Sequence, residues 1–276
     1  MRKCKSIVAG VAKSVRLSPA VRLSGIAAAG LITWTAGASA QTVQNGNFSS
    51  FTTAPTAAWS ELGDTNNGLT PALSNWAVPG SGIACVTGTN LTSSTAICGT
   101  NYTGNTGSNP SYATIWASPG APPVAGYTGN IIIADADSSY QETISQTLTG
   151  LTAGKTYSIS FYQAAAQQAG YTGAYNNYWQ VSLGSSSANS TVMPVASEGD
   201  AGWQKQVINF TATATSEVLS FLGQSSDTGA NEPPLVLLAD VTMQAAPEPA
   251  SLALLGVGFA GLVGLRRRRR QAAVTA

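Results

Sequence analysis

Residues 155–162, KTYSISFY, decide the fold class of this chain. Apolar and polar side chains alternate along the stretch, with Tyr157, Ile159 and Phe161 on one side and Ser158, Ser160 and Tyr162 on the other. A period of two places alternate side chains on opposite faces of a β-strand, so one face is expected to be buried. The stretch therefore predicts an antiparallel strand packed on a core.

The same alternation recurs in the central part of the chain. Residues 178–183 place Trp179, Val181 and Leu183 on the face predicted to be buried. Residues 42–48 are expected to form an opening strand and turn. Further strands are expected at 74–78, 112–116, 131–133, 144–148, 207–212, 218–222 and 235–243. Residues 164–170 could form one helical turn, and no apolar period of 3.6 is convincing. The predicted fold class is an all-β β-sandwich, with one domain at 41–246.

Several short segments resemble the galactose-binding-like jelly roll, the fold that carbohydrate-binding modules share. These segments are ISQTL at 144–148, LTAGKTY at 151–157, NGNF at 45–48 and LADV at 238–241. The resemblance implies two packed antiparallel sheets with the first and last strands adjacent. A shared fold does not by itself imply sugar binding.

Residues 1–40 are predicted to be a secretory signal peptide. Six basic residues lie within the first 22 positions, the apolar stretch 23–34 follows, and Ala38-Ser39-Ala40 completes the pattern. This order of parts is typical of a cleaved leader, and we expect cleavage after Ala40. A retained N-terminal anchor is the alternative.

The other end of the chain has three parts in a fixed order. Pro247-Glu248-Pro249 is followed by the apolar residues 250–265, and then by five arginines that begin with Arg266, Arg267 and Arg268. Sixteen apolar residues would form a helix of about 24 Å, slightly short of the hydrocarbon core of about 30 Å. The arginines would stay cytoplasmic together with the tail 271–276, which leaves the domain outside.

This tail, residues 247–270, resembles the PEP-CTERM sorting signal of Gram-negative bacteria, which is also catalogued as the ice-binding protein C-terminal domain. The resemblance implies recognition by an exosortase-type protease, removal of the helix, and association with exopolysaccharide and biofilm. The chain would pass through an inner-membrane intermediate before it reaches the cell surface or the extracellular matrix. An ordinary tail anchor without processing is the alternative.

The charges of the chain are segregated. Residues 41–246 hold two basic residues, Lys155 and Lys205, against eleven acids, which makes a formal charge of −9 without any arginine or histidine. Such a domain repels phosphate backbones, so nucleic acid is excluded as a partner.

The lack of histidine also removes most catalytic arrangements, including Ser-His-Asp triads and histidine-based metal centres. A pair of carboxylates could still hydrolyse glycosides, and the candidates are Glu142, Glu198, Asp200 and Glu232. No two acids share one strand face in apolar surroundings. We therefore expect a protein that is not an enzyme, with a carboxylate-dependent glycoside hydrolase as an alternative.

Two cysteines, Cys85 and Cys98, remain after the predicted leader. Outside the cytoplasm such a pair favours a disulfide, which would contribute about 3 kcal/mol through the entropy of the unfolded chain. Two reduced thiols are the alternative.

The jelly-roll resemblance also implies a place for structural calcium. Resembling modules hold Ca²⁺ near the first and last strands, and Asp240 stands at the acidic position of the closing motif. Ser49, however, stands where those modules carry glutamate. The pair Asp135 and Asp137 is a second place for an ion, although a solvated turn explains it better. Apart from this calcium, no cofactor is expected.

A glycan-binding surface is predicted from tyrosines and amides. Tyr162 and Tyr178 have outward parity beside Gln163 and Gln180, with Trp203 as a further candidate. If the two strands neighbour each other, these side chains form a surface suited to polyols; a solvated sheet face is the alternative. The predicted function is a non-catalytic matrix protein with weak carbohydrate binding. The alternative in another class is an adhesin-like structural protein without a defined ligand.

Overall fold

The computed structural model describes residues 42–54, 59–63, 72–80, 82–93, 114–225 and 234–246. The predicted leader (1–40), sorting signal (247–270) and cytoplasmic tail (271–276) lie outside these residues. Within the described ranges, no helix has the length and apolar character needed to cross a bilayer.

All regular elements in the described ranges are strands: β1 (Phe51–Thr53), β2 (Trp59–Glu61), β3 (Ala72–Leu73), β4 (Ala84–Thr87), β5 (Ile131–Asp135), β6 (Thr143–Thr149), β7 (Thr156–Gln167), β8 (Tyr175–Leu183), β9 (Ser186–Asn189), β10 (Met193–Val195), β11 (Asp200–Thr211), β12 (Ser216–Ser225) and β13 (Pro234–Ala245).

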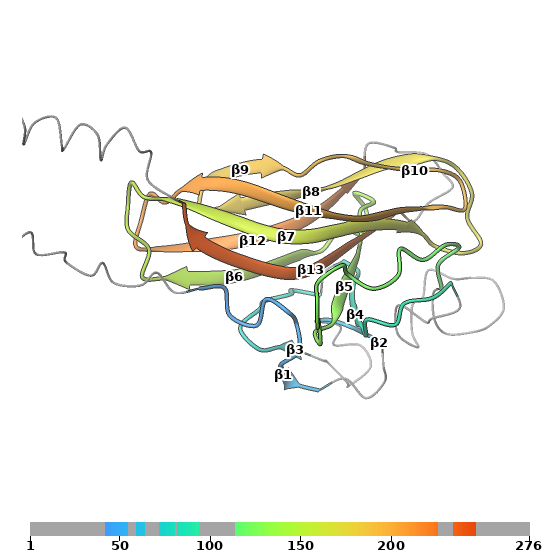
Figure 1. Cartoon of the computed structure of the whole chain (residues 1–276), viewed down its shortest axis with the longest axis horizontal. Coiled ribbons are helices and arrows are strands. Elements are labelled where there is room, and N and C mark those ends of the chain that lie inside the picture. The colour runs from blue at the N-terminus through green and yellow to red at the C-terminus, as the bar shows by residue number, and fades with distance from the viewer. Residues whose placement is uncertain are drawn as a thin grey trace, which may run out of the picture. The chain divides into compact units, whose positions relative to one another are not determined.

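The strands form two large antiparallel sheets (Figure 1). The five-stranded sheet has the order β10-β8-β12-β6, with β9 also paired to β8. The six-stranded sheet has the order β11-β7-β13-β5-β4-β2, and β1 pairs with β3 in a small separate sheet. The predicted all-β class is confirmed.

One core lies between the two sheets. Phe221 of the five-stranded sheet packs edge-to-face on Phe161 of the six-stranded sheet, with ring centroids 5.2 Å apart. Trp179, from the strand next to that of Phe221, packs edge-to-face on Phe221 at 6.1 Å. The side chains predicted to face inward from β7 and β8 are buried: Tyr157, Ile159, Phe161, Trp179, Val181 and Leu183. The packing between the sheets makes this domain a β-sandwich.

A second apolar cluster lies on the other face of the six-stranded sheet. It contains Leu235 and Leu237 of β13 and Ile131 and Ile133 of β5, with Ile115 from the segment before β5. Since Val236 and Leu238 point into the main core, β13 is buried on both faces. This double burial explains why β5 and β13 read as continuous apolar runs rather than as alternating ones.

Three sequence-based expectations differ from the structure. Residues 164–170 do not form a helical turn, because β7 continues to Gln167 and its alanines are buried on both faces. Residues 44–47 form the turn expected at 42–48, but no strand accompanies it, and Asn45 and Phe48 have φ values of 52° and 55°. Residues 74–78 and the described part of 112–116 contribute isolated bridges only, Ala77–Ser145 and Ile115–Gln168.

Several turns gather at one end of the sandwich, which we call the exit end because β13 finishes there (Figure 1, left). It consists of the turns 150–155, 184–185 and 212–215 together with Ala246. The turns are joined by backbone hydrogen bonds from Leu151 N–H to the Thr215 oxygen (3.1 Å) and from Gly154 N–H to the Ala212 oxygen (2.7 Å). The Ala246 N–H donates to the Thr156 oxygen at 2.9 Å and fixes the chain at this end.

Candidate functional site

The predicted tyrosine and amide residues do not form one surface. Tyr162 lies on β7 in the six-stranded sheet, whereas Tyr178 and Gln180 lie on β8 in the five-stranded sheet. The two tyrosines point outward from opposite sides of the sandwich, because their inward neighbours Phe161 and Trp179 both face the same core. The predicted joint site required β7 and β8 to be neighbours in one sheet, and they are not.

The side chains of Gln163 and Trp203 make contacts within the domain. Gln163 is fully buried, and its Nε2 donates to the Thr191 backbone oxygen at 2.7 Å. Trp203 packs partly buried on the second apolar cluster, and its Nε1 donates to the Gly120 oxygen at 2.9 Å. Tyr162 remains half-buried beside Lys205, whose Nζ lies 5.9 Å from the ring centroid. None of these three residues lies on the surface that carries Tyr178.

Tyr178 and Gln180 belong to an uncharged surface, which we call the neutral face. In register across β8 and β12, Tyr178 is opposite Gln224, Gln180 is opposite Leu222, and Ser182 is opposite Ser220. On the other side of β8, Gln180 is opposite Asn189 of β9. The neutral face consists of Thr143, Ser145, Thr147, Asn176, Tyr178, Gln180, Ser182, Ser187, Asn189, Ser220, Leu222 and Gln224.

The neutral face carries amides, hydroxyls, one aromatic ring and the aliphatic side chain of Leu222. Each amide offers two donors and one acceptor oxygen, and a tyrosine ring can also lie against an apolar C–H surface. The side chains of Gln180 and Gln224 make no hydrogen bond within the described part of the chain, while Ser182 and Ser220 share one of 2.6 Å. No member carries a charge, in a domain whose formal charge is −9. The face can therefore accept a neutral polyhydroxylated ligand.

The predicted calcium site around Asp240 is occupied by protein donors. The Tyr127 hydroxyl donates to the Asn130 oxygen (2.7 Å) and lies 3.3 Å from the Asn47 oxygen. Asn130 N–H also donates to the Asn47 oxygen (2.8 Å), and Asn130 Nδ2 donates to the Phe48 oxygen (2.7 Å). Burial raises the pKa of Tyr127 to about 12, and the Asp240 charge adds to this effect against a backbone hydrogen bond that lowers it. The phenol thus keeps its proton.

These residues do not fit a Ca²⁺ ion. The carbonyl oxygens of Asn47 and Asn130 already accept hydrogens from Tyr127 and Asn130, and Asp240 is a carboxylate whose charge acts on Tyr127. The Ser49 hydroxyl donates to Asn47 Oδ1 at 3.0 Å. Among the described residues there is no group of three or more side chains of the metal-binding types. A phenol and an amide tie these segments together, and calcium at Asp240 stays a prediction.

The other acids have local roles. Asp135 Oδ1 accepts the Asp137 N–H at 2.8 Å, and Asp137 Oδ1 accepts the Ser139 N–H at 2.7 Å, which makes this segment a hydrogen-bonded turn. Buried Glu142 accepts the Gly82 N–H (2.7 Å) on one oxygen and the Thr143 N–H (2.9 Å) on the other. Glu198 sits in the loop before β11 and Asp200 begins that strand, whereas Glu232 lies outside the described residues.

Cys85 is fully buried in β4 and is disulfide-bonded. Its predicted partner, Cys98, lies outside the described residues, so the pairing of the two stays a prediction.

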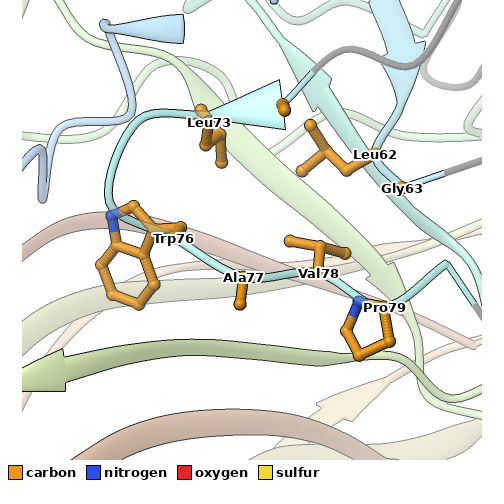
Figure 2. Close-up of a pocket in the computed structure, with 8 residues that line it drawn as sticks. Leu62, Gly63, Leu73, Trp76, Ala77, Val78 and Pro79 are labelled. Carbon is orange, nitrogen blue, oxygen red and sulfur yellow. The ribbon is translucent and has the colours of Figure 1, made fainter. Parts of the chain in front are cut away.

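A pocket of about 360 Å³ lies beside the edge strand β6. Figure 2 shows Leu62, Leu73 and Val78 turned toward the same space. The Trp76 Nε1 donates to the Asn45 oxygen at 3.0 Å, so the polar group of that ring is already used. The lining contains no ionisable or amide side chain: Leu62, Gly63, Ala72, Leu73, Trp76, Ala77, Val78 and Pro79. The pocket does not supply the groups that a polyol or a hydrolytic reaction needs.

Residues 245–269 match the model of the PEP-CTERM protein-sorting motif, which confirms the predicted motif and indicates export and surface sorting. No curated protein matches the sequence.

Solved structures are similar to part of this chain at low identity. A family 61 carbohydrate-binding module in complex with β-1,4-galactotriose is 13% identical over 63% of this chain and 90% of that chain, with a TM-score of 0.31. A family 22 xylan-binding domain from Paenibacillus barcinonensis is 14% identical over 50% and 82%, with a TM-score of 0.30. The enzymatically active domain of bacteriophage CBA120 tailspike protein 4 is 10% identical over 63% of this chain and 20% of that chain, with a TM-score of 0.35, so this chain spans a fifth of its length. Such low scores and identities assign no ligand or activity to this chain.

Proposed function

We propose that this protein is exported, sorted to the cell surface and bound to neutral glycans of the extracellular matrix through the neutral face, without catalysing a reaction. The observation that carries the proposal is the register of Tyr178, Gln180, Gln224 and Asn189 on one uncharged sheet face. The jelly-roll subclass of the β-sandwich belongs to the same proposal.

Charge selects the class of glycan. The domain 41–246 carries a formal charge of −9, and its two lysines lie outside the neutral face. Acidic polysaccharides would be repelled, since like charges disfavour association. Amide and hydroxyl groups exchange hydrogen bonds with sugar hydroxyls, and the half-buried Tyr178 ring offers a stacking surface. Neutral polysaccharides are therefore the expected ligands.

The route to the matrix follows from the two ends of the chain. A leader cleaved after Ala40 would start export, and the segment 250–265 with Arg266 to Arg270 would hold the chain in the inner membrane. An exosortase-type protease would then recognise the motif around Pro247-Glu248-Pro249 and release the domain. The sorting motif supports this route.

Affinity electrophoresis of the secreted protein in gels that contain neutral polysaccharides tests the ligand. We expect retardation by at least one neutral glucan, galactan or xylan. Tyr178→Ala should weaken it about tenfold, which corresponds to about 1.4 kcal/mol of stacking and contact energy. Tyr162→Ala is the matched control, because that tyrosine points outward from the opposite sheet.

Two results would contradict the proposal. Equal losses of retardation in the Tyr178→Ala and Tyr162→Ala variants would show that the neutral face is not the binding site. Lack of retardation by any polysaccharide would instead favour the structural, adhesin-like protein without a ligand. Hydrolysis of a polysaccharide that is lost in a Glu→Gln variant would favour the glycoside hydrolase.

A further inference from the structure

The folded domain ends directly before the sorting motif. β13 ends at Ala245, and the Ala246 N–H is still bonded to the Thr156 oxygen at 2.9 Å. Only Pro247-Glu248-Pro249 separates this fixed point from the apolar segment 250–265. Three residues span at most about 11 Å when fully extended. In a membrane-anchored precursor, the exit end would therefore lie within this distance of the bilayer surface.

The exposed side chains of the exit end are small and uncharged. Its three turns expose Thr152, Ala153, Gly154, Gly184, Ser185, Thr213, Ala214 and Thr215. Glu217 is the carboxylate at this end in the described part of the chain, and it is only 6% exposed. Its Oε1 accepts the N–H groups of Thr213 (2.8 Å) and Ala214 (3.1 Å), so its charge is turned into the protein.

A cation accompanies this uncharged surface. Lys155, one of the two lysines of residues 41–246, lies in the 150–155 turn at the exit end. It is half-buried, and its backbone oxygen accepts the Ala212 N–H at 3.0 Å. The exit end thus combines a positive charge with the lack of exposed acids among its described residues.

The opposite end of the same strands carries acids. Asp135 ends β5 opposite Leu235, and Asp200 begins β11 opposite Ala166, near the far end of β7. Asp137 and Glu198 lie in the adjoining turns, where Glu198 is exposed and Asp137 is half-buried. Among the described residues, Asp135, Asp137, Glu198 and Asp200 thus gather at the end opposite the exit end, where the one acid is the buried Glu217.

We propose that in the membrane-anchored precursor the exit end faces anionic lipid headgroups, while the acidic end points away from the membrane. This orientation rests on the proposed function, because it requires the segment 250–265 to anchor the chain. A negative membrane surface repels acidic groups within about 10 Å, the screening length at moderate salt. The short tether places the exit end in this zone, and the acidic end lies beyond it by the length of the strands.

Labelling of single engineered cysteines tests the orientation in the full chain, in membranes from cells without an exosortase. Ala153→Cys and Ala214→Cys place a thiol on two exit-end turns, and Thr172→Cys places one in the exposed loop at the opposite end. The reagent is a bulky polymer maleimide that does not cross membranes, and each rate is compared with the rate in detergent. We expect both exit-end rates to fall about tenfold in membranes, because a tether of about 11 Å leaves little room for a polymer coil. The Thr172→Cys rate should stay within about twofold of its detergent value by the same reach.

The outcomes separate the orientation from the anchor. Equal membrane-to-detergent ratios at the exit end and at Thr172, in a chain that pellets with membranes after carbonate washing, would overturn the orientation alone. A chain that does not pellet would overturn the anchor, and with it both the proposed sorting route and the orientation. The detergent rates show for each variant that the engineered thiol is reachable.

Discussion

The hydroxyl of Tyr127 lies 2.7 Å from the backbone oxygen of Asn130, to which it donates a hydrogen bond. Through Asn130, this contact joins the opening turn to the segment before β5, since Asn130 also donates to the oxygens of Asn47 and Phe48. The Val241 N–H donates to the Gly46 oxygen at 2.8 Å and adds the last strand to the same cluster. A single phenol therefore stands where the first and last segments of the sandwich meet.

Removal of the Tyr127 hydroxyl should destabilise the domain. Tyr127→Phe leaves the Asn130 oxygen without its donor, and we expect a loss of about 1–2 kcal/mol in the free energy of unfolding, measured by urea denaturation. Tyr140→Phe is the matched control, because the Tyr140 side chain is 49% exposed. Equal stability of the two variants would show that the hydroxyl contributes nothing to the fold.

The same cluster predicts how the domain responds to calcium. The carbonyl oxygens near Asp240 already accept protein hydrogens. Addition of Ca²⁺ or of a chelator, on the order of millimolar, should therefore leave the thermal midpoint of the wild-type domain unchanged. A midpoint that rises with Ca²⁺ and falls with the chelator would mean that an ion is bound after all. Differential scanning calorimetry measures both conditions.

Stability should decline in strongly alkaline solution. The pKa of Tyr127 is raised from 10.0 to about 12 in the folded state, so the folded chain holds this proton more tightly than the unfolded chain. Stability from this group is complete below pH 10 and is lost as the pH rises toward 12. The pH dependence of urea unfolding should be flatter in Tyr127→Phe over this window. Identical slopes in the two proteins would contradict the assignment.

Gly46 allows the opening turn to approach the last strand. A Cβ at this position would lie 1.8 Å from the Val241 backbone oxygen, which cannot move without breaking β13. Gly46→Ala is expected to lower the free energy of unfolding by about 3 kcal/mol or to prevent folding. Gly88→Ala is the control, since its Cβ would meet nothing within 4 Å. Circular dichroism with urea titration would detect the difference.

The strands with one buried face could be predicted from the sequence, whereas those buried on both faces could not be read by the same rule. Alternation located β7 and β8 because their polar side chains reach solvent on one side only. It failed at Ala164 to Ala166, where the core and the second cluster cover both faces and remove the period. The strand expected within 42–48 is also absent, and there the Asn45 side chain bonds both backbone groups of Ser50 and holds the expected turn.

The candidate site depended on information that local patterns do not contain. Tyr162 and Tyr178 have the predicted outward parity, but the loop between β7 and β8 crosses from one sheet to the other, so they cannot share a face. Tyr127 was missed for a related reason: its partners Asn47 and Asp240 lie far away in the sequence. Gly46 and Gly129, both of which stand where a Cβ would collide with backbone, are the signals that could have indicated close approach there.

The pairing of Cys85 with Cys98 gives the last prediction. Cys85 is disulfide-bonded and fully buried between strands, where its β4 position is opposite Ile133 of β5. If Cys98 is the partner, a loop of thirteen residues is closed, and its opening should cost about 3 kcal/mol by the entropy of the unfolded chain. Cys98→Ser and reduction of the wild type should then lower stability equally, and reduction should not change Cys98→Ser further. A larger loss in Cys85→Ser is expected, because it also places a hydroxyl in the core. Peptide mapping without reductant identifies the bonded pair, and a Cys98 thiol that reacts with iodoacetamide in the folded, oxidised protein would show that Cys85 has another partner.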